Sequence, residues 1–360
     1  MIDARAAVLL DQGADPQMAD IRIRPPADDE VLVRIEAVGI CHTDVSVAGR
    51  WPAGKLPMVF GHEGVGVVVD AAPGAAAAIG DRVVLTFSSC AECVNCAAGR
   101  PAYCAQSTTL NMRGDDGSAM SLDGKPLRGG FFGQSSFATH ALARPANAVV
   151  VSRDVDPALA APLGCSVQTG VGTVLNAMSL GFDDSLVVYG AGAVGLSAVL
   201  GAVIAGCRHI VAVDPIAERR TLASELGATL TLDPTEDVAA ALAALPGGGP
   251  TAAVDTTALP AVIGGALAGL RACGTLALVG LGALTAELPV GLIMAKGLRV
   301  RGAVEGDSEP HRFIPRLVEL WQRGDLPLEK LVTRYAFEDF DAAWTAARTG
   351  AAVKPVLTLP

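Results

Sequence analysis

The stretch SLVVYGAGAVGLSAVLGAVIAGCRHIVAVD, residues 185–214, decides the fold of the second half of this chain. An apolar run with adjacent valines leads into glycines at 190, 192 and 195. A long run of small and aliphatic residues follows, and then a second apolar run that ends at Asp214. This order predicts a buried strand, a tight turn, a helix and a second parallel strand. A G-x-G-x-x-G motif in that setting is typical of a dinucleotide-binding sheet.

Each position of the motif has a physical role. We expect Gly190 to allow the tight turn, Gly192 to let a pyrophosphate approach the backbone, and Gly195 to let helix and strand pack closely. Ala193 and Val194 would open the helix, whose free N–H groups and positive dipole end favour a phosphate.

The second strand ends in a carboxylate, which indicates the cofactor. Asp214 can accept hydrogen bonds from both adenosine ribose hydroxyls and would repel a 2′-phosphate, so NAD is favoured over NADP. Two alternatives stay open: Asp214 could be a helix N-cap before Ile216, and Arg219, beside Arg220, could serve a phosphate. We interpret Arg219 as packing along the ribose.

Residues 185–207 carry no charge and are long enough to span a bilayer. The glycine spacing favours a buried strand, turn and helix instead. The first residues, Met1 to Arg5, include an early acid and lack the apolar core of a signal peptide. We therefore expect a cytoplasmic protein without a membrane span.

Composition narrows the class of protein further. The chain has 360 residues, which favours two domains, and its 51% hydrophobic content excludes long-range disorder. The net charge is −10 and no block of Lys or Arg interrupts it, so nucleic-acid binding is excluded.

The pattern of elements changes along the chain. Short strands are predicted at residues 31–38, 65–69 and 81–85. Residues 88–136 suggest a long ordered loop that needs a cross-link, such as a bound metal, to hold it together. From 186 to 304 strands and helices alternate, which predicts a doubly wound parallel sheet. The last 50 residues resemble the first region, so we expect a discontinuous first domain.

Four of the eight cysteines stand close together. Cys90, Cys93, Cys96 and Cys104 form a C-x2-C-x2-C-x7-C pattern. Four thiolates at this spacing can hold one Zn²⁺ tetrahedrally and close a loop. An iron–sulfur cluster also accepts four cysteines, but a structural zinc is favoured because nothing else in the sequence indicates a redox partner.

A second metal site can be assembled from distant residues. His62 stands between glycines before a predicted strand, Cys41 lies upstream and Cys165 far downstream. Two thiolates and one imidazole leave a fourth position open for water or substrate, as in catalytic zinc sites. Cys207 and Cys273 are left over as buried core thiols.

The sequence resembles the zinc-dependent medium-chain alcohol dehydrogenases over essentially its whole length. The resemblance rests on Cys41-His42-Thr43-Asp44, Gly61-His62-Glu63-Gly64, the four-cysteine pattern, Cys165 with Thr169-Gly170, and the glycine turn. Residues 85–87, 131–139 and 162–165 are most similar to bacterial aryl (benzyl) alcohol dehydrogenases, a set that includes enzymes for allylic terpene alcohols such as geraniol.

The resemblance implies a fold and a set of roles. It implies a GroES-like β-rich catalytic domain, residues 1–163 and 306–360, and a Rossmann NAD-binding domain, residues 164–305. Cys41, His62 and Cys165 would hold catalytic zinc, with Glu63 behind them and Asp44 orienting His62. Thr43 would bind the alcohol and begin a proton relay. Some relatives carry a relay histidine where this sequence has Ser46, so the proton would leave through Ser46, the cofactor ribose, water or His42.

Further roles concern the cofactor and the pocket. The resemblance implies that His42 and Lys354 lie near the phosphates, Thr169 near the nicotinamide, and Val279 and Val304 at its carboxamide. Apolar pocket walls are expected from Trp51, Phe87, Phe131 and Phe132, some of which could instead be ordinary core residues.

The expected reaction is reversible hydride transfer from a primary aryl or allylic alcohol to NAD⁺, which gives the aldehyde. Alternatives are a secondary-alcohol, polyol or thiol-adduct formaldehyde dehydrogenase, or a catalytically silent zinc-binding relative. The family also implies two Zn²⁺ per chain and a homo-oligomer, a tetramer rather than a dimer, with residues 275–282 and 298–304 as edge elements for the contact.

Overall fold

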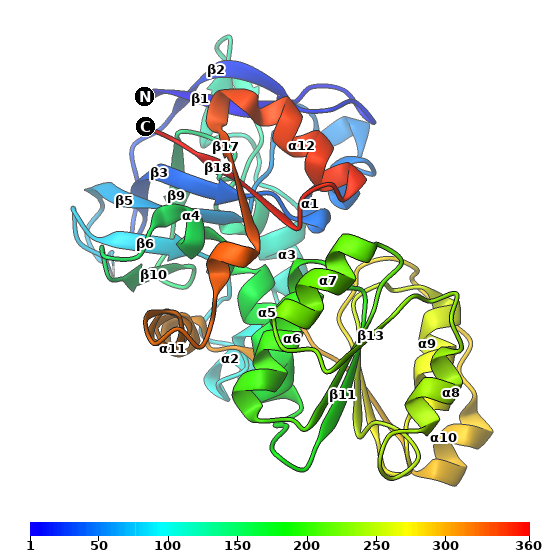
Figure 1. Cartoon of the computed structure of the whole chain (residues 1–360). Helices are drawn as coiled ribbons and strands as arrows, with labels where there is room; N and C mark the ends of the chain where they lie inside the picture. The colour runs from blue at the N-terminus through cyan, green and yellow to red at the C-terminus, as the bar shows by residue number, and fades with distance from the viewer. Residues whose placement is uncertain (76) are drawn as a thin grey trace. The chain divides into compact units, whose positions relative to one another are not determined.

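The structure of the chain is a computed structural model that describes residues 1–75 and 77–360 (Figure 1). It divides into two compact units. Unit 1 comprises Met1–Cys165, Glu309–Gly324 and Leu331–Pro360, and unit 2 comprises Ser166–Ser308 and Asp325–Lys330. Unit 1 is thus built from both parts of the chain that flank unit 2.

Unit 1 contains two sheets. The first has the strand order β4-β1-β2-β7-β8. Its strands are β1 (Ile2–Leu9), β2 (Gln17–Ile23), β4 (Met58–Val59), β7 (Met120–Leu122) and β8 (Lys125–Leu127). The second sheet has the order β10-β6-β5-β3-β18-β17, with β9 also paired to β3. Its strands are β3 (Val31–Gly39), β5 (Glu63–Ala71), β6 (Arg82–Leu85), β9 (His140–Ala143), β10 (Ala148–Val151), β17 (Val332–Ala336) and β18 (Lys354–Thr358).

The second sheet joins sequence-distant strands. β18 runs antiparallel to β3, with Val356 opposite Gly39 and Thr358 opposite Ala37 (Figure 1). β3 also pairs with β5, with Gly39 opposite Glu63. Residues 39–41, 62–63 and 354 therefore meet at one end of the sheet, where the candidate metal site lies.

The core of unit 1 is aliphatic with two aromatic clusters. Phe137 packs edge-on against Phe340, which stacks on Trp344 of helix α12 (Phe340–Thr349). A second cluster joins Trp51, Phe60 and Phe131. Short helices complete the unit: α1 (His42–Ala48), α2 (Val94–Ala97), α3 (Ser107–Met112), α4 (Pro157–Ala160) and α11 (Pro310–Gln322).

Unit 2 is built on a six-stranded parallel sheet with the order β13-β12-β11-β14-β15-β16. Its strands are β11 (Ser185–Tyr189), β12 (His209–Val213), β13 (Leu230–Leu232), β14 (Ala252–Asp255), β15 (Thr275–Leu278) and β16 (Arg299–Gly302). α5 (Ser166–Gly172), α6 (Ala193–Ala205) and α7 (Ala217–Glu225) lie on one face of this sheet in Figure 1. α8 (Val238–Ala243), α9 (Pro260–Gly269) and α10 (Val290–Lys296) lie on the other. The predicted α/β fold class is confirmed.

The glycine turn explains how β11 passes into α6. Gly190 has φ +89°, a conformation that favours glycine. A Cβ on Gly195 would collide with the carbonyl oxygen of Gly190, so the helix can approach the strand this closely only with glycine there. A Cβ on Gly192 would meet nothing within 4 Å, which leaves open space above the turn.

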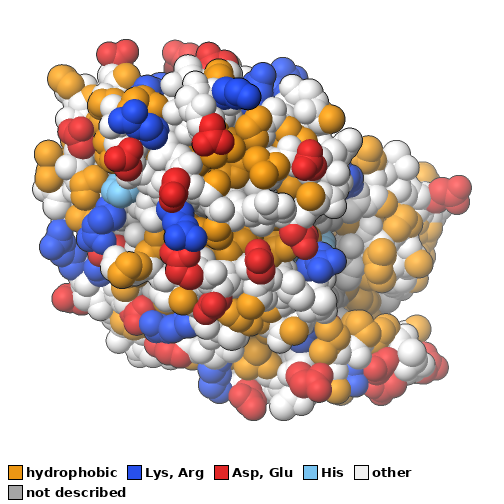
Figure 2. Space-filling view, turned by 90° about the horizontal axis from the view of Figure 1, so that it is seen from above, with side chains coloured by type: hydrophobic (Ala, Val, Ile, Leu, Met, Phe, Trp, Pro, Cys, Tyr) orange, Lys and Arg blue, Asp and Glu red, His pale blue; other side chains and the backbone are white. Residues whose placement is uncertain are grey.

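The interpretation of residues 185–207 as strand, turn and helix is confirmed. No single helix among the described residues is long and apolar enough to cross a membrane, although one bent pair, Pro157–Gly164 with Ser166–Ala177, passes by length and composition. On the face shown in Figure 2, basic and acidic side chains are interspersed.

The sequence prediction differs from the structure in three places. Residues 88–136, expected as one long loop, contain α2, α3 and the paired strands β7 and β8. Residues 275–282 were expected as an edge element, but β15 lies between β14 and β16, so of the two expected edge elements β16 alone lies at an edge of the sheet. Cys273, expected in the core, is exposed, whereas Cys207 is buried.

Candidate active site and metal centres

The first predicted ligand lies where β3 passes into α1. Cys41 is the N-cap residue of α1 and is buried. The carboxylate of Asp44, three residues on, accepts a hydrogen bond from the Cys41 backbone N–H at 3.0 Å. This reciprocal cap fixes the first turn of the helix and the direction of the Cys41 side chain.

Asp44 also holds the second ligand. Its Oδ1 lies 2.9 Å from Nδ1 of His62 and accepts from the Gly61 backbone N–H at 3.2 Å, and both side chains are fully buried. With Nδ1 engaged, the other ring nitrogen is left for a ligand. Nε2 of His62 is buried and has no hydrogen-bond partner within the described part of the chain.

The four donor groups Cys41, His62, Glu63 and Cys165 lie together, with ligand atoms all within 4.8 Å of one another. All four residues are buried. Two thiols, an imidazole with an unsatisfied nitrogen and a nearby carboxylate form a donor set that fits Zn²⁺. The structure therefore brings together the residues expected to hold catalytic zinc.

Electrostatics in this cluster favour a deprotonated thiol at Cys41. The hydrogen bond with Cys165, aided by the charge of Lys354, holds the pKa of the Cys41 thiol well below its ordinary value despite burial. Burial alone would lower the pKa of His62, but the charge and hydrogen bond of Asp44 outweigh it and raise that pKa well above the ordinary value.

Lys354 forms a buried ion pair beside the donor cluster. Its Nζ is almost fully buried and donates to Glu63 at 2.9 Å and to the carbonyl oxygen of Ile40 at 3.3 Å. Burial raises the pKa of Glu63, and Lys354 offsets only part of that rise. The pairing of β18 with β3 brings this ammonium into a buried ion pair with Glu63, and its expected place near the cofactor phosphates stays a prediction.

The alcohol-relay residues lie on α1. Thr43 and Ser46 are half-buried, and His42 is exposed at the start of the helix. Thr43 follows the ligand Cys41 by two residues. Ser46 lies one turn further along the helix, and its backbone carbonyl accepts from Arg50.

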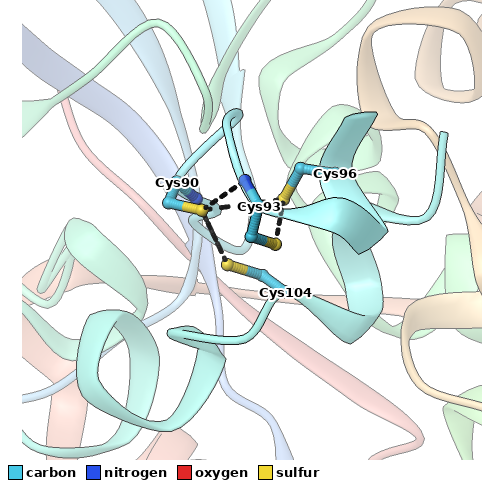
Figure 3. Close-up of side chains that lie close together, drawn as sticks. All are labelled: Cys90, Cys93, Cys96 and Cys104. Carbon is cyan, nitrogen blue, oxygen red and sulfur yellow. Dashed lines mark hydrogen bonds between the residues drawn. The ribbon is translucent and has the colours of Figure 1, made fainter. Parts of the chain in front are cut away.

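The four-cysteine lobe forms a second donor cluster (Figure 3). Sγ of Cys104 lies 3.4 Å from Sγ of Cys90, and Sγ of Cys93 lies 3.5 Å from Sγ of Cys96. Backbone N–H groups point at the sulfurs: that of Cys93 donates to Cys90, and that of Ala105 donates to Cys93. Four sulfurs that converge in this way fit a closed tetrahedral zinc.

The backbone donors favour thiolate in the lobe. The N–H of Ala105 is the largest cause that lowers the pKa of Cys93 to about 6. Burial raises the pKa of Cys96 to about 12, with the neighbouring cysteines adding to the rise. A bound cation would offset that cost because metal ligation deprotonates thiols outright.

In unit 2, Asp214 follows β12 beside the glycine turn and is 3% exposed. Its carboxylate accepts from the backbone N–H of Ala191 at 2.7 Å and of Ile216 at 2.8 Å. Asp214 therefore lies beside the glycine turn, whereas the N-cap residue of α7 is Ile216 and no side chain in the described part of the chain caps that helix. Arg219 Nη1 lies 4.0 Å from Asp214, whereas Arg220 pairs with Asp233.

The residues expected at the nicotinamide lie in two segments of unit 2. Thr169 of α5 donates its hydroxyl to Glu305 at 3.2 Å, and the Gln168 amide donates to the same carboxylate. Val279 follows β15 and its N–H donates to the carbonyl of Asp255, and Val304 is 46% exposed. Glu305, whose carboxylate accepts both of these hydrogen bonds, was not singled out from the sequence. Its backbone has φ +48°, in the left-handed region.

All four expected pocket residues are buried in the hydrophobic core of unit 1. Phe131 is fully buried, packed edge-on against Trp51, Phe60 and His62. Phe132, with φ +52°, stacks on the ring of His62 at 4.5 Å between centroids. Phe131 thus lies behind Phe132 as a core residue. Trp51 and Phe87 are 3% and 4% exposed.

Known proteins resemble this chain throughout. Residues 27–152 match the alcohol dehydrogenase GroES-like domain, and 193–323 match the zinc-binding dehydrogenase family. Geraniol dehydrogenase of Castellaniella defragrans is 45% identical over 366 residues, which cover 99% of this chain and 98% of that protein.

Two solved structures are similar over the full length. An alcohol dehydrogenase zinc-binding domain protein from Burkholderia ambifaria has a TM-score of 0.97 at 43% identity, covering 100% of this chain and 99% of the other. Benzyl alcohol dehydrogenase from Acinetobacter calcoaceticus has a TM-score of 0.95 at 39% identity, and the match covers 100% of both chains. The chain belongs to the zinc-dependent medium-chain alcohol dehydrogenases.

The buried pair of Glu63 and Lys354 gives a stability prediction. Lys354→Met leaves a buried carboxylate without its ammonium partner, so we expect the free energy of unfolding to fall by about 3–5 kcal/mol. The double variant Glu63→Met/Lys354→Met should recover most of that loss. Urea unfolding at equal metal content measures both.

An exposed pair supplies the control. Arg312 lies 3.2 Å from Glu309 and its side chain is 81% exposed, so Arg312→Met should change stability by less than about 1 kcal/mol. If Glu63→Met/Lys354→Met is as unstable as Lys354→Met alone, the unpaired carboxylate of Glu63 is not the cause of the lost stability, and the prediction fails.

Proposed function

We propose that this enzyme oxidises primary aryl or allylic alcohols to aldehydes with NAD⁺, in a reversible reaction. The main support is the 45% identity, over nearly the full length, to a protein described as geraniol dehydrogenase. The similarity to a benzyl alcohol dehydrogenase structure adds to it. Both names denote alcohols whose reacting carbon is bonded to an unsaturated carbon.

We further propose two Zn²⁺ per chain. Cys41, His62 and Cys165 would hold one, and Cys90, Cys93, Cys96 and Cys104 the other. The two clusters of converging donors support this assignment, because zinc takes both four thiolates and a set of two thiolates with an imidazole nitrogen such as the unpaired one of His62. When bound at the first cluster, zinc supplies Lewis acidity for alcohol oxidation.

The chain's own residues would position and deprotonate the substrate. Asp44 keeps His62 in the tautomer that presents Nε2, because Nδ1–H donates to the carboxylate. The Thr43 hydroxyl would accept the proton of the alcohol and pass it on. Ser46 stands next on α1, so the relay would continue through it, water or His42.

NAD⁺ would bind on unit 2. The open space over Gly192 leaves room for a pyrophosphate at the start of α6. The carboxylate of Asp214 lies beside that turn, as a group that accepts from ribose hydroxyls must. Val279, Val304 and Thr169 are the proposed contacts of the nicotinamide end.

Phe132 supports the choice of substrate. Its ring covers His62 face to face and is 9% exposed, so one face of the proposed site is flat and apolar. A planar aromatic or allylic group gains contact energy against such a surface, whereas ethanol offers little area.

The substrate proposal predicts a clear order of rates. kcat/KM for benzyl alcohol, cinnamyl alcohol and geraniol should exceed that for ethanol by at least about tenfold, since about 1.4 kcal/mol of extra apolar contact suffices. An NAD⁺-coupled assay measures this. A higher value for ethanol, a secondary alcohol, a polyol or a glutathione–formaldehyde adduct would contradict the proposal.

The metal proposal predicts separable losses. The native enzyme should contain about two zinc ions per chain. Cys41→Ser should retain about one and lose more than about 100-fold in kcat, because the ligand set of the catalytic ion is broken. Elemental analysis and the coupled assay check this. Full activity with one zinc missing from the first cluster would reject the role of Cys41.

We propose that the enzyme is a homo-oligomer, a tetramer rather than a dimer. β16 is an unpaired sheet edge, and apolar side chains nearby in the sequence are exposed: Leu284 by 98%, Val290 by 72% and Met294 by 79%. Such a set is typical of a buried interface rather than a solvated surface.

Light scattering after gel filtration tests the oligomer. The native protein should have about four times the chain mass, and Leu284→Asp with Met294→Lys should reduce it because charge is buried at the interface. Phe182→Asp, at another exposed apolar residue, is the control and should keep the native mass. A monomeric native enzyme would contradict the proposal.

A further inference from the structure

A buried amide connects the segments that carry two of the metal ligands. Gln134 is 4% exposed and lies in the run between Phe131 and Phe137. Its Nε2 donates to the carbonyl oxygen of His62 at 2.9 Å and to that of Thr86 at 3.1 Å. Its Oε1 accepts from the backbone N–H of Gly64 at 3.1 Å and from the Ser136 hydroxyl at 2.9 Å.

Residues 134–137 contact residues 60–64, the segment that contains His62, along its whole length. The Ser136 N–H donates to the carbonyl of Gly61, and that of Phe137 donates to Phe60. A Cβ on Gly64 would lie 2.6 Å from the Ser136 side chain and 3.1 Å from Oε1 of Gln134. The residues on both sides of His62 are therefore held by residues 134–137.

Thr86 extends the connection to the third ligand. Its hydroxyl donates to the carbonyl oxygen of Gly164 at 2.7 Å, and Gly164 immediately precedes Cys165. Thr86 is fully buried, and a Cβ on Gly164 would collide with the backbone of Leu85. The backbone of Cys165 is thus fixed against β6, and β6 is joined by Gln134 to His62.

We propose that Gln134 is a positioning residue that, through Thr86, fixes His62 and Cys165 relative to one another for metal binding. Asp44 does the same for Cys41 and His62, so the two side chains together hold all three ligands. The inference rests on the proposed metal site at Cys41, His62 and Cys165. It adds a residue that touches no ligand atom.

The chemistry of the site requires an amide. Two carbonyl oxygens face Nε2, and two donors face Oε1, so a neutral group with both donors and acceptors is needed. A carboxylate would face the carbonyl oxygens of His62 and Thr86 without a hydrogen to donate. Methionine has a similar length but leaves all four partners without their bond, which makes Gln134→Met the cleanest variant.

The experiment follows zinc release from the holoenzyme to a chromogenic chelator. Changes in residues that orient metal ligands cost about 10–100-fold in metal affinity, so Gln134→Met should speed release from the Cys41 site by about that factor. Release from the four-cysteine lobe should stay at the native rate. Variants Cys41→Ser and Cys93→Ser assign the two phases.

A second buried amide gives a reciprocal control. Asn111 is 3% exposed and binds the backbone of Ser88, two residues before Cys90, and that of Ser107. Asn111→Leu should speed release from the lobe alone. If Gln134→Met releases zinc at the native rate, or speeds both phases by the same factor, the proposal is overturned.

The link through Thr86 has its own test. Thr86→Val should speed release from the Cys41 site and Thr86→Ser should restore it, because serine keeps the hydroxyl. In the double variant Thr86→Val/Gln134→Met, the increase in the rate of zinc release should be smaller than the product of the two single increases. That result is expected when both residues act through one connected set of hydrogen bonds. Cobalt loaded into the Cys41 site should show a shifted absorption spectrum in Gln134→Met and Thr86→Val.

Two outcomes separate this inference from the proposed function. A native enzyme whose zinc content and release are unchanged by Cys41→Ser holds no zinc at the Cys41 site, which overturns the metal site and this inference with it. A native enzyme with two zinc ions whose release Gln134→Met leaves unchanged overturns the role of Gln134 alone.

Discussion

The carboxylate of Asp44 is the constraint on which the rest of unit 1 depends. It is fully buried, and it accepts hydrogen bonds from the Cys41 backbone, the Gly61 backbone and the ring of His62. Those contacts begin α1, orient the thiol and select the ring nitrogen that is free. A buried charge with three donors is a rigid centre, because moving any donor leaves the carboxylate unsatisfied.

In both units, glycine residues let two backbone segments approach each other closely. In unit 2, Gly190 and Gly195 bring α6 against β11 and leave room above Gly192. In unit 1, Gly64 and Gly164 bring two ligand-bearing segments against residues 134–136 and β6. Small residues, which make up much of this composition, permit both arrangements.

Local sequence patterns predicted the elements of unit 2 and one of the two metal sites. The apolar runs and glycines around 185–214 indicated β11, α6 and β12 because periodicity and turn chemistry are local. The four cysteines of the lobe were predictable for the same reason. Gln134 and Thr86 were not, since their partners lie up to 78 residues away in the sequence. A polar residue within an aromatic run, as at Gln134, was the one available signal. The ion pair of Lys354 with Glu63 was not predictable either, because nothing local shows that β18 pairs with β3.

The pairing of β18 with β3 has a consequence for how the protein is made. Most of unit 2 is one continuous segment, Ser166–Ser308, whereas the sheet of unit 1 needs strands at 31–39 and at 354–358. During synthesis from the N-terminus, β3 can pair with β5 early, but its pairing with β18 must wait until the whole middle segment has been translated. The thiols at 41, 90–104 and 165 would emerge long before Lys354 reaches Glu63, so the nascent chain carries reactive, unburied cysteines for most of its translation.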